Sequence, residues 1–219
     1  MSKNTKIFLS IGLTIIVLLL IIAFIFFKNL RLNDVDGDLL KRDTDHAPKI
    51  GDKNAPNIVV EFMDFKCPYC KKFDQITLDK LYKKHIKADD IQYRVINASI
   101  LGKDSTNGAR AAYAVKLYYP KKYWEFHHRI FELQPNHENQ WITNKLIDEE
   151  LSNMNIPKDK LKKIKLDYKT KGSKSWKLAN KDKNLYKKYK NDSVPSVYVN
   201  GHFVKTPYQS TEIEKLLKN

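Results

Sequence analysis

From Asn57 to Cys70 the chain reads NIVVEFMDFKCPYC, an apolar run that leads into a Cys-Pro-Tyr-Cys tetrapeptide. The run from Asn57 to Phe65 is rich in Val, Ile and Phe and has the length of a buried strand. From Pro68 to about Ile86, apolar residues recur at helical spacing, which predicts a helix that begins beside the first cysteine. A C-x-x-C at the junction of a strand and a helix is typical of a redox site.

The chain has only two cysteines, and both lie in this tetrapeptide. Pro68 suits the first position of a helix, so Cys67 falls at the helix N-terminus, where free N–H groups and the helix dipole stabilise a thiolate. Cys70 follows three residues later, about one helical turn, so its sulfur can reach that of Cys67. We therefore predict that Cys67 and Cys70 are catalytic and form a redox-active disulfide, with no other cofactor.

Two other uses of the cysteines are weaker explanations. A zinc knuckle needs two further ligands, and histidines would have to supply them without the usual spacing. A structural disulfide fits an oxidising compartment, but a bond that closes a four-residue loop removes little chain entropy. No metal ligands are predicted, because the acidic residues Asp34, Asp36 and Asp38 also lack the full spacing of a calcium loop.

Toward the N-terminus, Ile7 to Phe27 form an uncharged apolar run of 21 positions. A helix of this length spans about 30 Å, the thickness of the hydrocarbon core of a bilayer. The apolar region of a cleaved signal peptide is shorter and ends at small residues, whereas this run ends Phe-Ile-Phe-Phe. We expect residues 1–28 to be an uncleaved single-pass anchor in the cell membrane, with the catalytic part outside the cytoplasm.

The rest of the chain mixes strands and helices. Residues 29–55 are polar and are predicted to be a tether. Short apolar runs predict three further strands: Ile91–Ser99, Val197–Asn200 and His202–Lys205. Residues 103–190 read as successive helices, and Thr211–Lys218 reads as a terminal helix. This order predicts an α/β domain, residues 56–102 and 191–219, interrupted by a helical insertion over 103–190.

The chain is basic, with 40 Lys and Arg against 25 Asp and Glu and a formal net charge of +15. Only five of the basic residues are Arg, although Arg is the better side chain for phosphate and base edges. An excess of Lys, Asn and Ile is typical of an AT-rich genome and needs no ligand. We predict no nucleic-acid binding, and the charge favours proximity to an anionic membrane or wall polymer.

Four motifs in this order resemble DsbA-like thiol–disulfide oxidoreductases, closest to the membrane-anchored forms of Gram-positive bacteria. The motifs are E-F-x-x-F-x-C-P-x-C (Glu61 to Cys70), A-R-A-A-Y-A (Ala109 to Ala114), Y-W-E-F-H (Tyr123 to His127) and V-P-S-V-Y-V-N-G (Val194 to Gly201). The similarity covers about residues 50–218. It implies an α/β thioredoxin fold with an inserted all-helical domain, preceded here by one transmembrane helix.

The resemblance also implies roles for residues outside the cysteine pair. It implies that Pro195 is cis and lies against the disulfide, and that backbone groups of Val194 bind a substrate strand. It implies that Glu61 is a buried acid near the second cysteine. Pro68 and Tyr69 separate the cysteines, where the best-known oxidases have Pro-His. A tyrosine offers only a hydroxyl hydrogen bond in place of a cationic imidazole, so Pro68, Tyr69 and Glu61 are expected to tune the thiolate.

We therefore expect an extracytoplasmic enzyme that introduces disulfides into exported cysteine-containing proteins. The resemblance implies a quinone-linked membrane partner that reoxidises the enzyme in many relatives. A reductase or isomerase of protein disulfides on the same fold is the first alternative, because the direction of exchange depends on the reduction potential. A tethered protein-binding module, in which the disulfide is only a staple, is the second.

Overall fold

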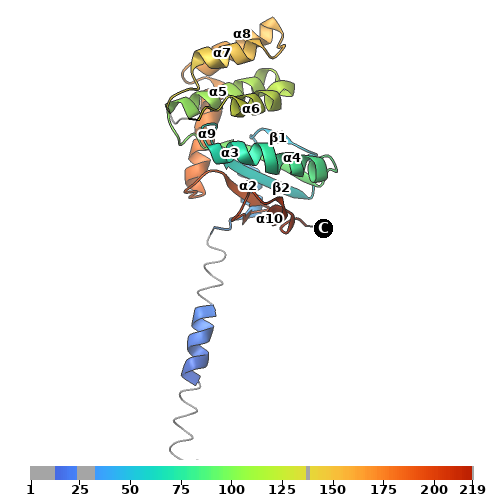
Figure 1. Cartoon of the computed structure of the whole chain (residues 1–219), viewed down its shortest axis with the longest axis vertical. Helices are drawn as coiled ribbons and strands as arrows, with labels where there is room; N and C mark the ends of the chain where they lie inside the picture. The colour runs from blue at the N-terminus through green and yellow to red at the C-terminus, as the bar shows by residue number, and fades with distance from the viewer. Residues whose placement is uncertain (1–12, 24–32, 137–138, 219) are drawn as a thin grey trace, which may run out of the picture. The chain divides into compact units, whose positions relative to one another are not determined.

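The computed structural model describes residues 13–23, 33–136 and 139–218, and it divides into two compact units, residues 1–34 and 35–219 (Figure 1). In the first unit, residues 13–23 form a helix whose large apolar side chains are exposed. No helix within the described ranges is long and apolar enough to cross a membrane. The two ends of the predicted span, residues 7–12 and 24–27, lie outside the described residues.

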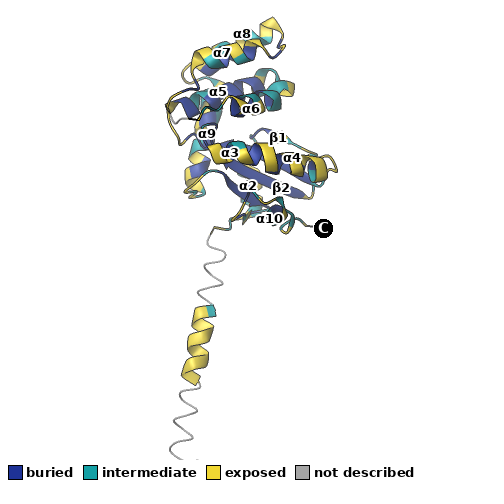
Figure 2. Ribbon diagram, viewed as in Figure 1, coloured by how far each residue is buried: buried dark blue, intermediate teal, exposed yellow. Residues whose placement is uncertain are grey.

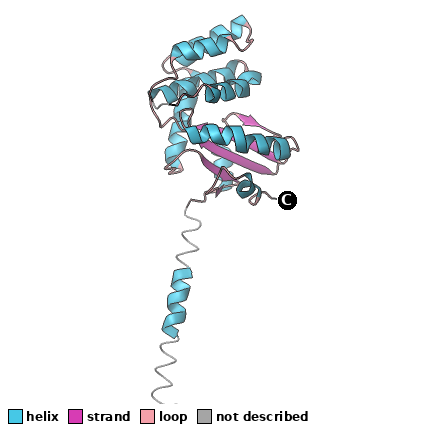
Figure 3. Cartoon of the chain, in the orientation of Figure 1, coloured by secondary structure: helices cyan, strands magenta, loops and turns pink. Residues whose placement is uncertain are grey.

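The second unit is built on a five-stranded sheet in the order β1-β3-β2-β4-β5 (Figure 3). The strands are β1 Lys49–Ile50, β2 Asn57–Met63, β3 Ile91–Asn97, β4 Ser196–Val199 and β5 His202–Phe203. Strands β2 and β3 are parallel, because the helix that follows the cysteines connects them, and the other three pairs are antiparallel.

The helices agree with the predicted order. One continuous helical segment follows the cysteines and consists of α3 Pro68–Lys72, a π-helical stretch Phe73–Leu78, α4 Asp79–Leu81 and a second π-helical stretch Tyr82–Ile86. The segment 103–190 holds α5 Lys103–Tyr118, α6 Tyr123–Glu132, α7 Asn144–Ser152, α8 Lys158–Lys169 and α9 Lys174–Lys188. The terminal helix α10 is Ser210–Glu214.

The residues of β2 are almost all buried (Figure 2), and because successive side chains of a strand point to opposite sides, both faces of the sheet are covered. Val59 and Met63 join a core cluster with Phe73 of the helical segment after the cysteines and with side chains of α5 to α8. Phe62 on the other face joins a cluster with Leu185 of α9. The helices of 103–190 therefore share their hydrophobic core with the sheet.

The predicted tether over residues 29–55 is wrong from Val35 onward. Helix α2 spans Gly37–Asp43, and the carboxylate of its N-cap residue Asp36 accepts a hydrogen bond from Leu39 N at 2.9 Å. Leu40 in this helix is buried against the sheet. Strand β1 then pairs antiparallel with β3. The segment is mostly polar, so its sequence did not indicate the amphipathic helix or the two-residue edge strand.

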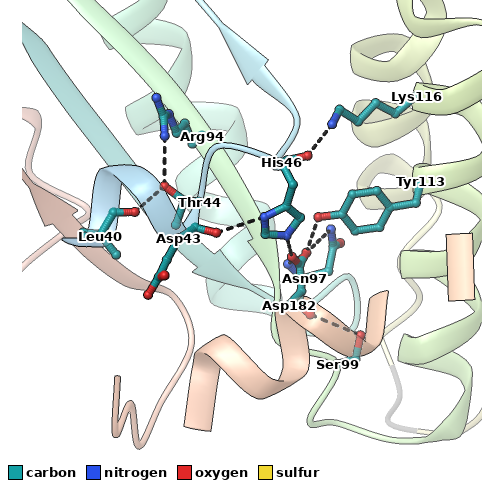
Figure 4. A network of polar contacts seen from close by, with 10 residues as sticks. All are labelled: Leu40, Asp43, Thr44, His46, Arg94, Asn97, Ser99, Tyr113, Lys116 and Asp182. Carbon is teal, nitrogen blue, oxygen red and sulfur yellow. Dashed lines mark hydrogen bonds and ion pairs between the residues drawn. The ribbon is translucent and has the colours of Figure 1, made fainter. Parts of the chain in front are cut away.

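A buried carboxylate ties four segments of the fold together (Figure 4). Asp182 of α9 accepts hydrogen bonds from His46 Nε2 at 2.7 Å, from Asn97 N of β3 at 2.8 Å and from the Tyr113 hydroxyl of α5 at 2.7 Å. Lys116 of α5 donates to the carbonyl of His46. These bonds hold the segment after α2 and the helices α5 and α9 against strand β3.

Candidate active site

The two cysteines lie at the start of α3, which follows β2 in the chain after a short loop. Cys67 is the N-cap, with extended backbone angles of φ −81° and ψ 117°, and Pro68 is the first helical residue. Both thiols are free, and Cys67 is 4% exposed while Cys70 is 0% exposed. A reagent from solution can therefore reach only the first sulfur.

Their surroundings make the two thiols chemically unequal. A hydrogen bond from the Cys70 thiol lowers the pKa of Cys67 against the opposing effect of burial, and the backbone N–H groups of Cys70 and Tyr69 lower it further. Burial raises the pKa of Cys70 well above its ordinary value, and the hydrogen bond to Cys67 and the charge of Glu61 raise it further. Cys67 is therefore the thiol suited to be nucleophile and leaving group, as predicted from its place at the helix start.

The loop before β4 contacts the first cysteine. The Cys67 thiol donates a hydrogen bond to the carbonyl of Val194 at 3.2 Å. The Val194–Pro195 peptide bond is cis, as the resemblance implied, and Pro195 is buried. Residues 127 positions apart in the sequence thus meet at the sulfur. Among the described residues, Val194 therefore provides the acceptor for the Cys67 thiol.

Glu61 lies on β2 and is buried at the same site. Its Oε2 accepts a hydrogen bond from the Tyr93 hydroxyl, and its Oε1 has no hydrogen-bond partner. Burial raises the Glu61 pKa well above its ordinary value, the bond from Tyr93 lowers it, and the charges of Asp74 and Cys67 raise it. The Glu61 carboxyl therefore holds its proton to a higher pH than an exposed glutamate does. Tyr93 was not predicted as a site residue. Glu61 is in register with Val95 of β3, and Tyr93 lies two residues before Val95, so the side chains of Tyr93 and Glu61 lie on the same face of the sheet.

Asp64 orders the loop that carries Cys67, and it was also missed from the sequence. Its carboxylate accepts hydrogen bonds from the backbone N–H groups of Lys66, Ile100 and Leu101, at 2.8, 2.8 and 2.9 Å. Its carbonyl accepts from Cys67 N at 3.0 Å. The acceptor and two of its donors lie on loops that only the fold brings together, so no sequence pattern marks them.

Two cavities flank the contact between Cys67 and Val194. One, of about 840 Å³, is lined by Cys67, Pro68, Tyr69, Ile100, Leu101, Gln134 and Val194 among others. The other, of about 360 Å³, is lined by Tyr69, Val194, Pro195, Phe203, Val204 and Tyr208 among others. Tyr69 borders both cavities and is 60% exposed. The sulfur therefore opens onto a concave, partly apolar surface that an extended peptide can enter.

Comparison with known proteins agrees with this geometry. The thioredoxin family matches residues 42–219. The "Probable disulfide bond formation protein D" of Bacillus anthracis is 32% identical over 222 residues, 99% of each chain, and the "Disulfide bond formation protein D" of Bacillus subtilis is 32% identical over 78% of this chain and 75% of its own.

Solved structures give the same result. The crystal structure of oxidised BdbD from Bacillus subtilis superposes with a TM-score of 0.73 and 31% identity, and covers 82% of this chain and 95% of that one. The structure of Chlamydia trachomatis DsbA, at 18% identity and a TM-score of 0.65 over 78% of this chain and 90% of its own, shares the fold. The chain therefore belongs to the thioredoxin family and, within it, to the DsbA-like thiol–disulfide oxidoreductases.

Proposed function

We propose that this thiol–disulfide oxidoreductase works as an oxidase outside the cytoplasm and introduces disulfides into exported proteins. The inequality of the two thiols carries this proposal. A lowered Cys67 pKa stabilises the thiolate, and so the reduced enzyme, which makes the Cys67–Cys70 disulfide the stronger oxidant. The sulfurs supply the redox chemistry, so Cys67 and Cys70 are the catalytic residues.

The reaction consists of two exchanges. A substrate thiolate attacks the Cys67 sulfur of the enzyme disulfide, the S–S bond breaks, and Cys70 leaves and takes up a proton, as its raised pKa favours. A second substrate thiolate attacks the substrate sulfur of this mixed disulfide, and Cys67 leaves as a thiolate. Two electrons pass from two substrate thiols to the enzyme, which yields a substrate disulfide and the reduced enzyme.

The residues around the sulfurs hold the substrate and tune the thiolate. In the free enzyme the Val194 carbonyl accepts a hydrogen bond from the Cys67 thiol. When an extended substrate peptide binds between the two cavities, a backbone N–H of that peptide replaces the thiol as the donor to this carbonyl. Pro195 forms the wall beside it. Pro68 sets the helix start, and Tyr69 covers the entrance. We assign Glu61 to proton exchange with Cys70, because the two buried groups interact and both have raised pKa values, so each holds a proton that the other can receive.

The N-terminal run Ile7–Phe27 anchors the enzyme in the lipid bilayer in this proposal. Its uncharged length supports the anchor. The reduced enzyme must be reoxidised after each turnover. A quinone-linked membrane protein fits that role, because the anchor would keep enzyme and reoxidant in one membrane.

The test is turnover in both directions with the same preparation. The oxidised protein is mixed with a reduced two-cysteine peptide, and the reduced protein is mixed with insulin. The proposal expects stoichiometric oxidation of the peptide within the mixing time and slow reduction of insulin. Fast insulin reduction with little peptide oxidation would favour the reductase. Inactivity of Cys67→Ser in both assays excludes a contaminant.

A further inference from the structure

A second polar cluster lies on the helical segment that starts at the cysteines. Asp74, in the π-helical stretch Phe73–Leu78, faces His127 and His128 on α6. One ligand atom of each of the three residues lies within 4.8 Å of the others. The described part of the chain holds no second group of three such residues this close together. The proposed thiol–disulfide exchange uses none of these three side chains.

The spacing of these atoms suits a tetrahedral metal ion. His127 Nε2 lies 3.3 Å from Asp74 Oδ1, and His128 Nδ1 lies 3.0 Å from Asp74 Oδ2. Zinc binds imidazole nitrogen and carboxylate oxygen at about 2.0–2.1 Å, so neighbouring corners of its tetrahedron lie about 3.3 Å apart. His127 Nε2 and His128 Nδ1 lie 3.3 and 3.0 Å from the same oxygen, Asp74 Oδ1, which is close to the length of an edge of that tetrahedron.

His127 gives an independent indication of a ligand. Its side chain is 0% exposed, and neither ring nitrogen has a partner with hydrogen-bond geometry. Its Nε2 has only the 3.3 Å contact to Asp74 Oδ1 and its Nδ1 has no partner, so the buried imidazole has replaced its bonds to water incompletely, which is costly. Aromatic rings surround it, with the centroids of Phe65, Trp124 and Phe131 at 5.5, 5.3 and 5.1 Å. A metal ion would satisfy the Nε2 nitrogen.

The cluster also has an open side. Asp74, Trp124, His128 and Glu132 line a cavity of about 420 Å³. Water or a further oxygen ligand can reach the cluster from there. Glu132 lies one turn after His128 on α6 and lines the same cavity, so its carboxylate is one candidate for such a ligand.

We propose that Asp74, His127 and His128 bind a divalent zinc-type cation, with a fourth coordination position open to the cavity. Two nitrogens and one carboxylate oxygen are a ligand set that zinc accepts, and three protein ligands with one open position define a reactive rather than a closed site. The sequence hid this set, because Asp74 lies 54 positions before His128 and the histidines adjoin each other on one helix.

The experiment measures zinc binding to the full-length protein in detergent, with Cys67 and Cys70 oxidised so that no thiolate is available. Equilibrium dialysis is expected to give one tightly held zinc ion per chain. Removing a direct ligand should cost at least the 10–100-fold that is typical of outer-shell changes, so His128→Ala and Asp74→Asn should each lose about 100-fold in affinity. Cobalt in the same site should show the visible absorption of a tetrahedral centre.

A matched control is His85→Ala, which removes a different histidine that is paired with a carboxylate, Asp90 at 2.7 Å. This variant should bind zinc like the wild type. His128 is 46% exposed, so its substitution should leave the fold intact, and circular dichroism checks this. The proposal is overturned if the oxidised wild type retains no zinc at micromolar concentration, or if His128→Ala binds it as tightly as the wild type.

Discussion

At the scale of single residues, one turn of helix separates two thiols of opposite character. Cys67 receives hydrogen bonds from the Cys70 thiol and from backbone N–H groups, whereas Cys70 is enclosed by apolar side chains. Cys67 should therefore react with iodoacetamide faster than Cys70 at mildly acidic pH. Mass spectrometry of the singly alkylated protein identifies which sulfur has reacted. Faster alkylation of Cys70 would reverse the roles given to the two residues.

The serine variants divide the same roles. Cys67→Ser should abolish disulfide exchange, because the remaining thiol is buried and protonated. Cys70→Ser should still be captured in mixed disulfides with substrate, since Cys67 keeps its place at the helix start. Non-reducing gels with a cysteine-containing peptide distinguish the two variants. Equal capture by both would show that either sulfur can be attacked.

Tyr69 is the residue through which the thiolate can be tuned without disturbing the core. It is 60% exposed and lies 6.0 Å from the ring of Tyr208, between centroids. Tyr69→His should lower the Cys67 pKa and make the enzyme more oxidising, because a cationic imidazole stabilises the thiolate. The absorbance of the thiolate as a function of pH measures this. Tyr69→Phe is the control, and an equal shift there would assign the effect to the lost hydroxyl.

Glu61 should give stability a defined dependence on pH. Its folded-state pKa is raised by burial, so the folded protein holds this proton to higher pH than the unfolded chain does. Stability from this group is therefore full below the unfolded pKa and is lost as pH rises toward the folded pKa. Between about pH 5 and pH 8 the wild type should therefore lose stability through this group, which Glu61→Gln should not lose.

Urea unfolding of both proteins at the two pH values measures this difference. The glutamine keeps a carbonyl oxygen for the Tyr93 hydroxyl, so the hydrogen bond that Glu61 accepts is retained. Other titrating groups affect both proteins alike and cancel in the comparison. If the pH dependence of the glutamine variant equals that of the wild type, Glu61 is not held protonated by the fold.

At the scale of elements, Asp182 connects α9 to the sheet and to α5. Asp182→Ala removes the acceptor of Asn97 N and of the Tyr113 hydroxyl, both buried. Each unsatisfied buried donor costs about 1–3 kcal/mol, so the variant should lose about 3 kcal/mol or more of unfolding free energy. Asp159→Ala, on the exposed surface of α8, is the control and should change stability little. Similar urea midpoints for the two variants would contradict this account of the network.

Most elements could be predicted because each carries its own pattern. β2 and β3 are runs of apolar and β-branched residues, and α5 to α9 repeat at helical spacing. Helix α2 and strand β1 could not be found this way. Their residues are mostly polar, and only their partners in β3 and in the core make Leu40 and Ile50 structural.

The site divides in the same way. The cysteine motif is a local pattern, and the Val-Pro pair was expected from the resemblance to DsbA-like oxidoreductases. Asp64, Tyr93 and Asp182 act through partners 32 to 136 positions away, such as Tyr93 with Glu61 and His46 with Asp182. No local sequence pattern identifies these residues, because Asp and Tyr also occur commonly in surface loops and helices. Only the register of the strands and the packing of α9 reveal them.

At the scale of the whole molecule, the proposed membrane anchor rests on the N-terminal run. The run Ile7–Phe27 has no small residues at its end for cleavage, so the mature protein should keep its N-terminus and leave the membrane only with detergent. Alkaline carbonate washing of membranes, followed by N-terminal sequencing, measures both properties. Recovery of a soluble form that begins near residue 30 as the sole product would refute the anchor.

The central claim is that the enzyme is an oxidant, and its reduction potential tests that claim most directly. The full-length protein is equilibrated with defined ratios of reduced to oxidised glutathione, and the fraction of Cys67–Cys70 disulfide is measured at each ratio. The stabilised Cys67 thiolate predicts a potential nearer to about −120 mV, as in strong oxidants, than to about −270 mV, as in thioredoxin. A value at or below that of thioredoxin would contradict the account and identify the protein as a reductase.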